Sequence, residues 1–347
     1  MQRADIAKPA LLLIGIVAVI TAGTGLAALG LSAGPSQPDS DGISGQSPEQ
    51  FQPANINPDV DPETGQISLA TASESKRILI DTDHSNRFDR TKLQPVFETL
   101  TEQGHTVRFS GNIEQSSTST GQSSRFASAL SDFDAVMIFY PTEQFTDNEI
   151  DQLRTFTNTG GRVVMFGGPS AFDVSTSLFG SSVSSVQFGG NTLLERYGMR
   201  INSDLLYNTN DRRTDNNYKS IYVEPSQSDS LTQGVNTVNL DSSGSIVIAE
   251  NSRAKPLLRA TEGTQRFSTR RSGQYVTAAR TTNFVAISDT TFLTDTDVYD
   301  VDNEQFVGNL LSFLASGNKA NFPRTSGDTN GTDSADSMNS TNTTASG

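Results

Sequence analysis

The side chains best suited to chemistry follow directly on a short apolar run. Residues 77–80 read RILI, and Asp81, Asp83 and His84 come next. A short apolar run bounded by polar residues is typical of a buried parallel strand, and open α/β sheets bind ligands at the carboxyl ends of such strands. An Asp and a His placed there could bind a polar ligand or a divalent cation, or transfer protons. The alternative is that they cap the loop after the strand.

Two glycines follow another predicted strand, at 162–166. Gly167 and Gly168 could let a ligand phosphate approach the next helix, or they could serve only the turn itself. The chain has no G-x-x-x-x-G-K-[ST] run, which argues against nucleotide binding.

Ser170 and Ser288 each come at the end of a predicted strand, and a serine nucleophile needs a base within hydrogen-bond reach. His84 and Asp289 are the residues that could complete a triad, although the sequence lacks the G-x-S-x-G elbow of serine hydrolases. We therefore expect ligand binding more than catalysis at this edge of the sheet. The expected ligand-binding residues are Asp81, Asp83, His84, Gly167, Gly168 and Asp289.

The elements that must position these residues alternate between strands and helices. The first half of the folded part predicts strands at 77–81, 106–110, 135–140 and 162–166, with helices at 90–103 and 146–160. The second half predicts strands at 220–224, 245–249 and 283–288, a hairpin pair at 256–260 and 274–279, and helices at 193–197 and 305–315. This alternation predicts an α/β fold with a doubly wound, mainly parallel sheet.

Composition excludes several classes of protein. The 347 residues include no Cys, which rules out a disulfide framework, a thiolate metal site and a cysteine nucleophile. The net charge is −14, and six of the 25 basic residues are Lys. Such an acidic surface with little Lys is typical of a protein from a high-salt organism; the alternative is an ordinary acidic surface protein. A nucleic-acid partner is not expected, because no basic patch is visible.

The N-terminal part of the chain predicts a membrane anchor. Residues 10–33 are uncharged and apolar and are long enough to span a bilayer, although a cleaved signal peptide is the alternative. Basic residues come before the span and acidic residues after it, so we expect residues 1–8 in the cytoplasm, a single span at 9–34, and the rest outside the cell. Residues 35–75 are rich in Pro, Ser, Gly and Gln and predict a disordered linker.

The folded domain is predicted at 76–318 and a disordered tail at 319–347. Three sequons in that tail, at Asn330, Asn339 and Asn342, fit an extracytoplasmic location. Acidic residues between 289 and 304 resemble a calcium loop only in composition, because the central Gly and terminal Glu of an EF-hand are missing. We expect a solvated surface there, with no metal and no cofactor.

The order of these motifs resembles a known family. Residues 78–84 read ILIDTDH, Gly104-His105 precede the second strand, 145–149 read FTDNE, and 160–164 read GGRVV. This pattern resembles the DUF4350 and GldG-like auxiliary domains of ABC-type transport systems, and the N-terminal domain of an intraflagellar-transport protein. All of these are similar to class I glutamine amidotransferases, with a flavodoxin-like sheet. The resemblance covers 76–170 well and 171–316 loosely.

The resemblance implies a function without glutamine hydrolysis. The amidotransferase nucleophile is a Cys on a strand-to-helix elbow, and the nearest equivalent here, residues 167–170, reads GGPS. We expect a membrane-anchored, extracytoplasmic, non-catalytic domain that acts as an auxiliary part of a membrane complex, with an ABC-type permease as partner. The alternatives are a serine hydrolase and a structural protein of the cell envelope.

Overall fold

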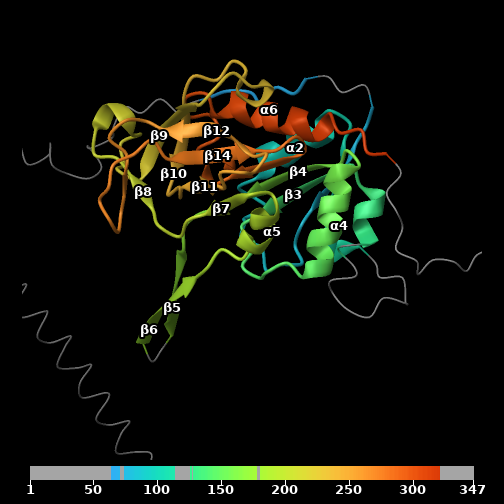
Figure 1. Cartoon of the computed structure of the whole chain (residues 1–347), viewed down its shortest axis with the longest axis horizontal. Helices are drawn as coiled ribbons and strands as arrows, with labels where there is room; N and C mark the ends of the chain where they lie inside the picture. The colour runs from blue at the N-terminus through green and yellow to red at the C-terminus, as the bar shows by residue number, and fades with distance from the viewer. Residues whose placement is uncertain (1–63, 71–73, 114–125, 127, 178–179, 321–347) are drawn as a thin grey trace, which may run out of the picture. The chain divides into compact units, whose positions relative to one another are not determined.

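The computed structural model describes residues 64–70, 74–113, 126, 128–177 and 180–320 (Figure 1). The predicted anchor at 9–34, most of the predicted linker, nearly all of the predicted tail and the three sequons lie outside these ranges. Within them, no helix combines the length and the apolar character that a bilayer span requires.

Nine strands form one mixed sheet in the order β10-β9-β12-β14-β15-β4-β3-β1-β2. Neighbours are parallel along β2 (Thr106–Phe109), β1 (Arg77–Ile80), β3 (Ala135–Phe139), β4 (Arg162–Phe166) and β15 (Phe284–Ile287). From β15 onward they are antiparallel, through β14 (Val276–Arg280), β12 (Lys255–Ala260), β9 (Ser220–Pro225) and β10 (Val238–Asp241). The α/β class is confirmed, and the sheet is parallel over five strands and antiparallel beyond them.

The order β2-β1-β3-β4 is that of flavodoxin-like sheets, in which the chain reverses its direction of travel between β1 and β3. Loops that leave β1 and β3 at this point diverge to opposite faces of the sheet. In open sheets of this order the crevice outside the carboxyl ends of these two strands is the usual place for a ligand, and the sequence places Asp81 and His84 there.

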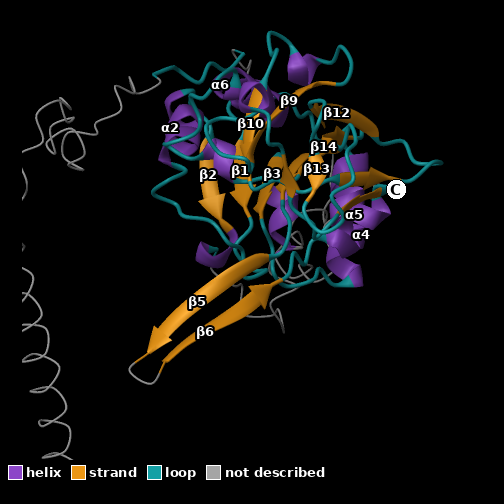
Figure 2. Cartoon of the chain, turned by 90° about the vertical axis from the view of Figure 1, so that its left-hand side faces the viewer, coloured by secondary structure: helices purple, strands orange, loops and turns teal. Residues whose placement is uncertain are grey.

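Helices cover both faces of the sheet (Figure 2). One face packs on α2 (Gln94–Glu102) and α6 (Asn303–Ala315), and the other on α4 (Asp147–Asn158) and α5 (Asn191–Arg196). Strand β1 shows the alternation that this requires, since Ile78 and Ile80 lie in the first core and Leu79 lies in the second. Side chains on all three positions are fully buried, as expected for a central strand.

Short elements lie around the central sheet. Strands β7 (Met199–Ile201) and β11 (Ile246–Ile248) form one small sheet, and β8 (Leu206–Tyr207) and β13 (Gln265–Arg266) form another. The predicted strand at 245–249 therefore exists but lies outside the central sheet. Short 3-10 helices are formed by Ser110–Asn112, Leu130–Asp132, Asp211–Arg213, Ser230–Thr232 and Thr291–Leu293. The hairpin of β5 (Ala171–Ser177) and β6 (Gly180–Val186), which the sequence does not predict, projects from the body (Figures 1 and 2).

Local chemistry explains where the helices begin and end. Helix α2 begins later than its predicted start at residue 90, and Pro95 lies in its first turn, where a missing N–H costs nothing. Gly104 follows its end with a φ of +83°, a conformation that glycine adopts without strain. Helix α4 begins as predicted, because Thr146 and Glu149 form a reciprocal capping box.

Candidate functional site

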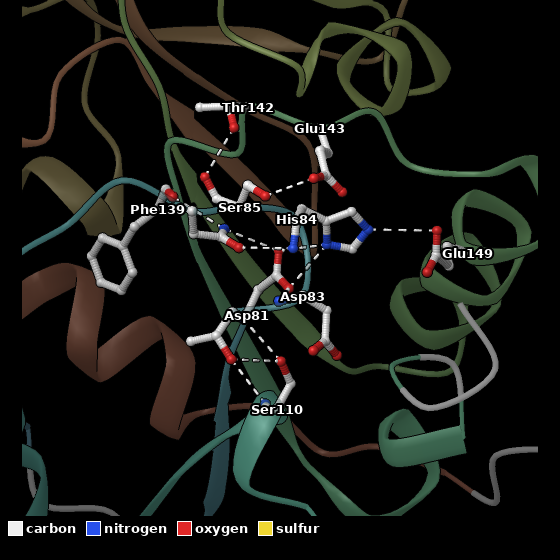
Figure 3. A network of polar contacts seen from close by, with 12 residues as sticks. Asp81, Asp83, His84, Ser85, Ser110, Phe139, Thr142, Glu143 and Glu149 are labelled. Carbon is white, nitrogen blue, oxygen red and sulfur yellow. Dashed lines mark hydrogen bonds and ion pairs between the residues drawn. The ribbon is translucent and has the colours of Figure 1, made fainter. Parts of the chain in front are cut away.

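The loop after β1 folds back so that His84 contacts Asp81 (Figure 3). The His84 Nδ1 lies 2.9 Å from Asp81 Oδ2 and 3.0 Å from Oδ1. Asn86 supports the same carboxylate, because its Nδ2 donates to Asp81 Oδ2 at 3.1 Å and to the carbonyl of Phe139 at 3.1 Å. Asp81 is fully buried and His84 is only 3% exposed, so these side chains lie inside the protein.

The second ring nitrogen of His84 faces helix α4. His84 Nε2 lies 3.5 Å from Glu149 Oε2, and the same oxygen accepts the Thr146 N–H at 2.9 Å and the Thr146 hydroxyl at 2.7 Å. The imidazole stacks on Phe145 with centroids 3.8 Å apart and meets the edge of Phe126. Helix α4 therefore holds Glu149 with its own N-cap and presents it to the ring.

Two buried carboxylates determine the charge of His84. Burial alone would lower the pKa of this imidazole, but its hydrogen bonds to Asp81 and Glu149 outweigh that effect and raise the pKa to about 9. Burial opposes the ionisation of Glu149, and its hydrogen bonds to His84 and Thr146 nevertheless lower the pKa of that carboxyl below its usual range. At neutral pH the group is therefore an imidazolium between two carboxylates.

Backbone contacts join this loop to the loop after β3. The His84 carbonyl accepts the N–H groups of Thr142 and Glu143 at 3.0 and 3.1 Å, and the Arg87 N–H donates to the Tyr140 carbonyl at 3.0 Å. One residue in each loop has a left-handed backbone, Ser85 with φ +49° and Tyr140 with φ +31°, which is uncommon for residues other than glycine. The two loops that bound the crevice are thus held together by hydrogen bonds.

The predicted triad residues have other partners. Ser170 Oγ donates to Gln187 Oε1 at 2.9 Å. Ser288 Oγ lies 2.8 and 2.9 Å from the carbonyls of Gly244 and Thr277. No hydrogen bond or ion pair among these described residues joins His84 to Ser170, Ser288 or Asp289, so the structure does not assemble the predicted triad.

The resemblance suggested that the turn after β4 is the equivalent of a strand-to-helix elbow. In the structure this turn does not lead into a helix. Residues 167–170 lead into the β5–β6 hairpin, so the glycines do not precede a helix N-terminus. A Cβ at Gly167 would lie 2.6 Å from Phe188 and 2.7 Å from Ile201. A side chain at position 167 would therefore require the ends of Phe188 and Ile201 to shift. Of the two alternatives for these glycines, the structure fits the turn and offers no helix N-terminus for a phosphate.

Gly167, Gly168 and Asp289 meet instead at a pocket of about 250 Å³ at the carboxyl ends of β3, β4 and β15. The other lining residues are Arg87, Tyr140, Pro169, Ser170, Ala171, Asp241, Ser242, Thr290 and Thr291. A second pocket of about 360 Å³ adjoins it and shares Gly168 and Ser170. The structure thus divides the six predicted ligand-binding residues into a buried group around His84 and a group at this pocket. Their role in ligand binding remains a prediction.

Sequence reasoning missed two acidic residues that matter here. Glu149 was visible as a first-turn acid of α4, but nothing in the sequence connects it to His84. Asp241 ends β10, a strand that was not predicted from the sequence. Among the described residues, no group of three or more His, Asp or Glu side chains could hold a metal ion.

Comparison with known proteins gives one family and several similar folds. The family model described as an ABC-type uncharacterized transport system matches residues 75–283. No curated protein matches the chain.

Among solved structures, the mmIFT52 N-terminal domain is 14% identical with a TM-score of 0.51, over 70% of this chain and 99% of that one. A ThuA-like protein from Parabacteroides merdae is 10% identical, with a TM-score of 0.41 over 70% of this chain and 91% of that one. The glutaminase domain of Trypanosoma brucei CTPS, solved with bound acivicin, is 9% identical, with a TM-score of 0.35 over 72% and 97%. At such identities the first of these likenesses supports the fold alone, and the other two are too distant to carry an argument.

Proposed function

We propose that this chain, which belongs to the family of ABC-type uncharacterized transport systems, is a non-catalytic auxiliary subunit that binds a ligand or a partner at the carboxyl edge of its sheet. The family supports the association with transport. The binding role rests on the chemistry of the site.

The observation that carries the proposal is how the reactive groups are held. Both ring nitrogens of His84 face carboxylates, at 2.9 Å from Asp81 and 3.5 Å from Glu149. A protonated imidazole between two carboxylates cannot accept a proton from a nucleophile. No Cys occurs in the chain, and the Ser288 hydroxyl lies against backbone carbonyls. His84 and Ser288 are therefore each held by partners within the fold, and neither is placed as the base or the nucleophile of a triad.

We further propose that residues 10–33 anchor the protein in the cell membrane and that the folded domain at 76–318 lies outside the cytoplasm. The uncharged apolar run, with basic residues before it and acidic residues after it, supports this arrangement. In that arrangement the domain would meet the outer loops of an ABC-type permease.

The test of the auxiliary role is purification of the tagged full chain from its own membranes in a mild detergent and molar salt. We expect the permease and the ATPase of one transport system to purify with it, and not with an unrelated membrane protein carrying the same tag. A chain that emerges alone under conditions in which the permease stays bound to its ATPase would refute the proposal. Fluorophosphonate probes should leave the chain unlabelled.

Topology can be tested cleanly because the chain has no Cys of its own. Thr269→Cys introduces a thiol on an exposed loop of the domain, and Gln2→Cys introduces one before the apolar run. We expect a membrane-impermeant maleimide to label the first variant in intact cells and the second only after permeabilisation. The reverse pattern would place the domain in the cytoplasm.

A further inference from the structure

The pocket at the ends of β4 and β15 contains two carboxylates whose hydrogen bonding is incomplete. Asp289 is 3% exposed, and its Oδ1 accepts the Thr291 N–H at 2.5 Å and lies 2.7 Å from the Thr291 hydroxyl. Its other oxygen, Oδ2, has no hydrogen-bond partner within the described part of the chain, and neither has Oδ1 of Asp241. Both residues line the same pocket.

These two side chains are close enough for the charge of Asp241 to act on Asp289. The Thr291 hydroxyl lies 3.1 Å from the backbone carbonyl of Asp241 as well as 2.7 Å from the Asp289 carboxylate. Burial, and to a smaller extent the charge of Asp241, raise the pKa of Asp289 to about 8. A buried acceptor left without a donor costs about 1–3 kcal/mol, so two of them in one pocket mark a place where a donor is missing.

We infer that this pocket binds its ligand through a primary ammonium group held between Asp241 and Asp289. This inference rests on the non-catalytic binding role proposed above and names the chemistry that the site recognises. An ammonium group carries three N–H donors and a positive charge. Once Asp289 has lost its proton, the ammonium group satisfies both open carboxylate oxygens and offsets the repulsion between the two charges.

Other ligand classes fit the pocket less well. An anion would meet the Asp241 carboxylate and an Asp289 oxygen that lacks a donor, so it would be repelled and would leave that oxygen unsatisfied. A neutral polyol supplies donors but no positive charge to favour the ionised form of Asp289. A divalent cation needs more anionic or carbonyl ligands than two carboxylates provide, and no group of three or more acidic or histidine side chains among the described residues could hold a metal ion.

The remaining charged and titratable groups around the pocket set limits on the ligand. Arg87 lines the pocket and has interactions of its own, and its charge acts on Tyr140. The Tyr140 hydroxyl donates to the Pro169 carbonyl at 2.6 Å and is already satisfied. Burial and, to a smaller extent, the charge of Asp241 raise the pKa of the Asp297 carboxyl. The volume of about 250 Å³ suits a small amine.

The test uses the full chain in detergent and measures binding by isothermal titration calorimetry with propylamine hydrochloride. Three further probes separate the contributions: 1-propanol has a donor without charge, tetramethylammonium chloride has charge without N–H donors, and calcium chloride is a divalent cation. We expect propylammonium to bind, and Asp289→Asn and Asp241→Asn each to weaken its binding by about 10- to 100-fold, as expected for loss of a charged hydrogen bond. Asp297→Asn is the matched control, since it removes a nearby carboxylate that does not line the pocket.

Dependence on pH provides a second readout. Propylammonium should drive the proton off Asp289, so its affinity should rise as the pH approaches about 8 and then level off. This rise should be missing in Asp289→Asn. If that variant does not fold, Asp241→Asn, whose side chain is partly exposed, tests the same site.

Three results would overturn the inference: no binding of propylammonium, binding that survives both Asn variants, or calcium binding that both variants abolish. The outcome is separable from the proposed function, because co-purification with a permease needs no amine. If the chain purifies with a permease but does not bind propylammonium, only the inferred ligand class is refuted. If it binds propylammonium but purifies without a permease, only the auxiliary role is refuted.

Discussion

Raising the pH should weaken the fold through the loss of the proton from the imidazolium of His84. The pKa of His84 is about 9 in the folded chain, against an ordinary value of 6.5. A group whose pKa is raised by folding stabilises the folded state fully below its unfolded pKa, and this contribution is lost as the pH rises through the folded pKa. The loss should therefore occur between about pH 6.5 and about pH 9.

The size of the effect follows from the two pKa values. The difference between about 9 and 6.5, at about 1.4 kcal/mol for each pKa unit, amounts to about 3 kcal/mol. Solvent screening should reduce this little, because His84 is only 3% exposed. The expected loss is a large share of the about 5–15 kcal/mol by which domains are usually stable.

The assay is urea unfolding of the full chain followed by far-UV circular dichroism, since the chain has no Trp to report by fluorescence. Free energies of unfolding are compared for the wild type and His84→Gln between about pH 6 and about pH 10. Asp289 also has a raised pKa, of about 8 against 3.8, so its contribution falls over about pH 3.8 to 8. This contribution of Asp289 to the free energy of unfolding falls equally in the wild type and in His84→Gln, so it cancels when the two free energies are subtracted.

The chain contains its own control in its only other histidine. His105 is also buried, but burial and the charge of Lys76 lower its pKa below the ordinary value. Its contribution is lost as the pH falls, so the difference between wild type and His105→Gln should stay flat above about pH 6.5. If the difference for His84→Gln is equally flat, the imidazole is neutral in the folded chain, and the reading of the crevice as an ion triad is wrong.

Three further predictions concern the elements around the site. Thr146→Ala removes the N-cap of α4 and should cost about 1 kcal/mol in urea unfolding, and NMR titration should show a lower pKa for His84 because Glu149 loses its support. Gly167→Ala forces a methyl group to within 2.6 Å of Phe188 and should cost about 1–3 kcal/mol. Gly168→Ala, whose Cβ would meet its first neighbour at 3.3 Å, should change the urea midpoint far less; equal losses in both variants would contradict the packing argument.

The sequence predicted the elements that flank Asp81 and His84 because the signals for them are local. The apolar run before Asp81, the cap at Thr146 and the glycine at the end of α2 each depend on a few neighbouring residues. Strand and helix periods are recognisable over such distances. These parts of the fold were therefore predicted close to where the structure has them.

Contacts between distant parts of the chain could not be predicted in this way. Glu149 meets His84 only because β3 lies beside β1, which brings the first turn of α4 to the loop after β1. The antiparallel half of the sheet was predicted in part, since the predicted hairpin pair at 256–260 and 274–279 corresponds to β12 and β14. The strand at 220–224 gave no sign that it pairs with β12, and β10 was not predicted. The hairpin at 171–186 was missed because its Ser-rich strands carry little apolar alternation.

The two groups of polar residues at this edge of the sheet differ in one physical respect. Around His84, both ring nitrogens and the carboxylates of Asp81 and Glu149 have partners. At the pocket, Asp241 and Asp289 each keep a buried oxygen without a donor. Satisfied polar groups hold a structure together, whereas an unsatisfied one is costly and calls for a partner from outside. The inferred amine site therefore lies with the acids at the ends of β10 and β15, whereas the hydrogen bonds of His84 join the loops after β1 and β3.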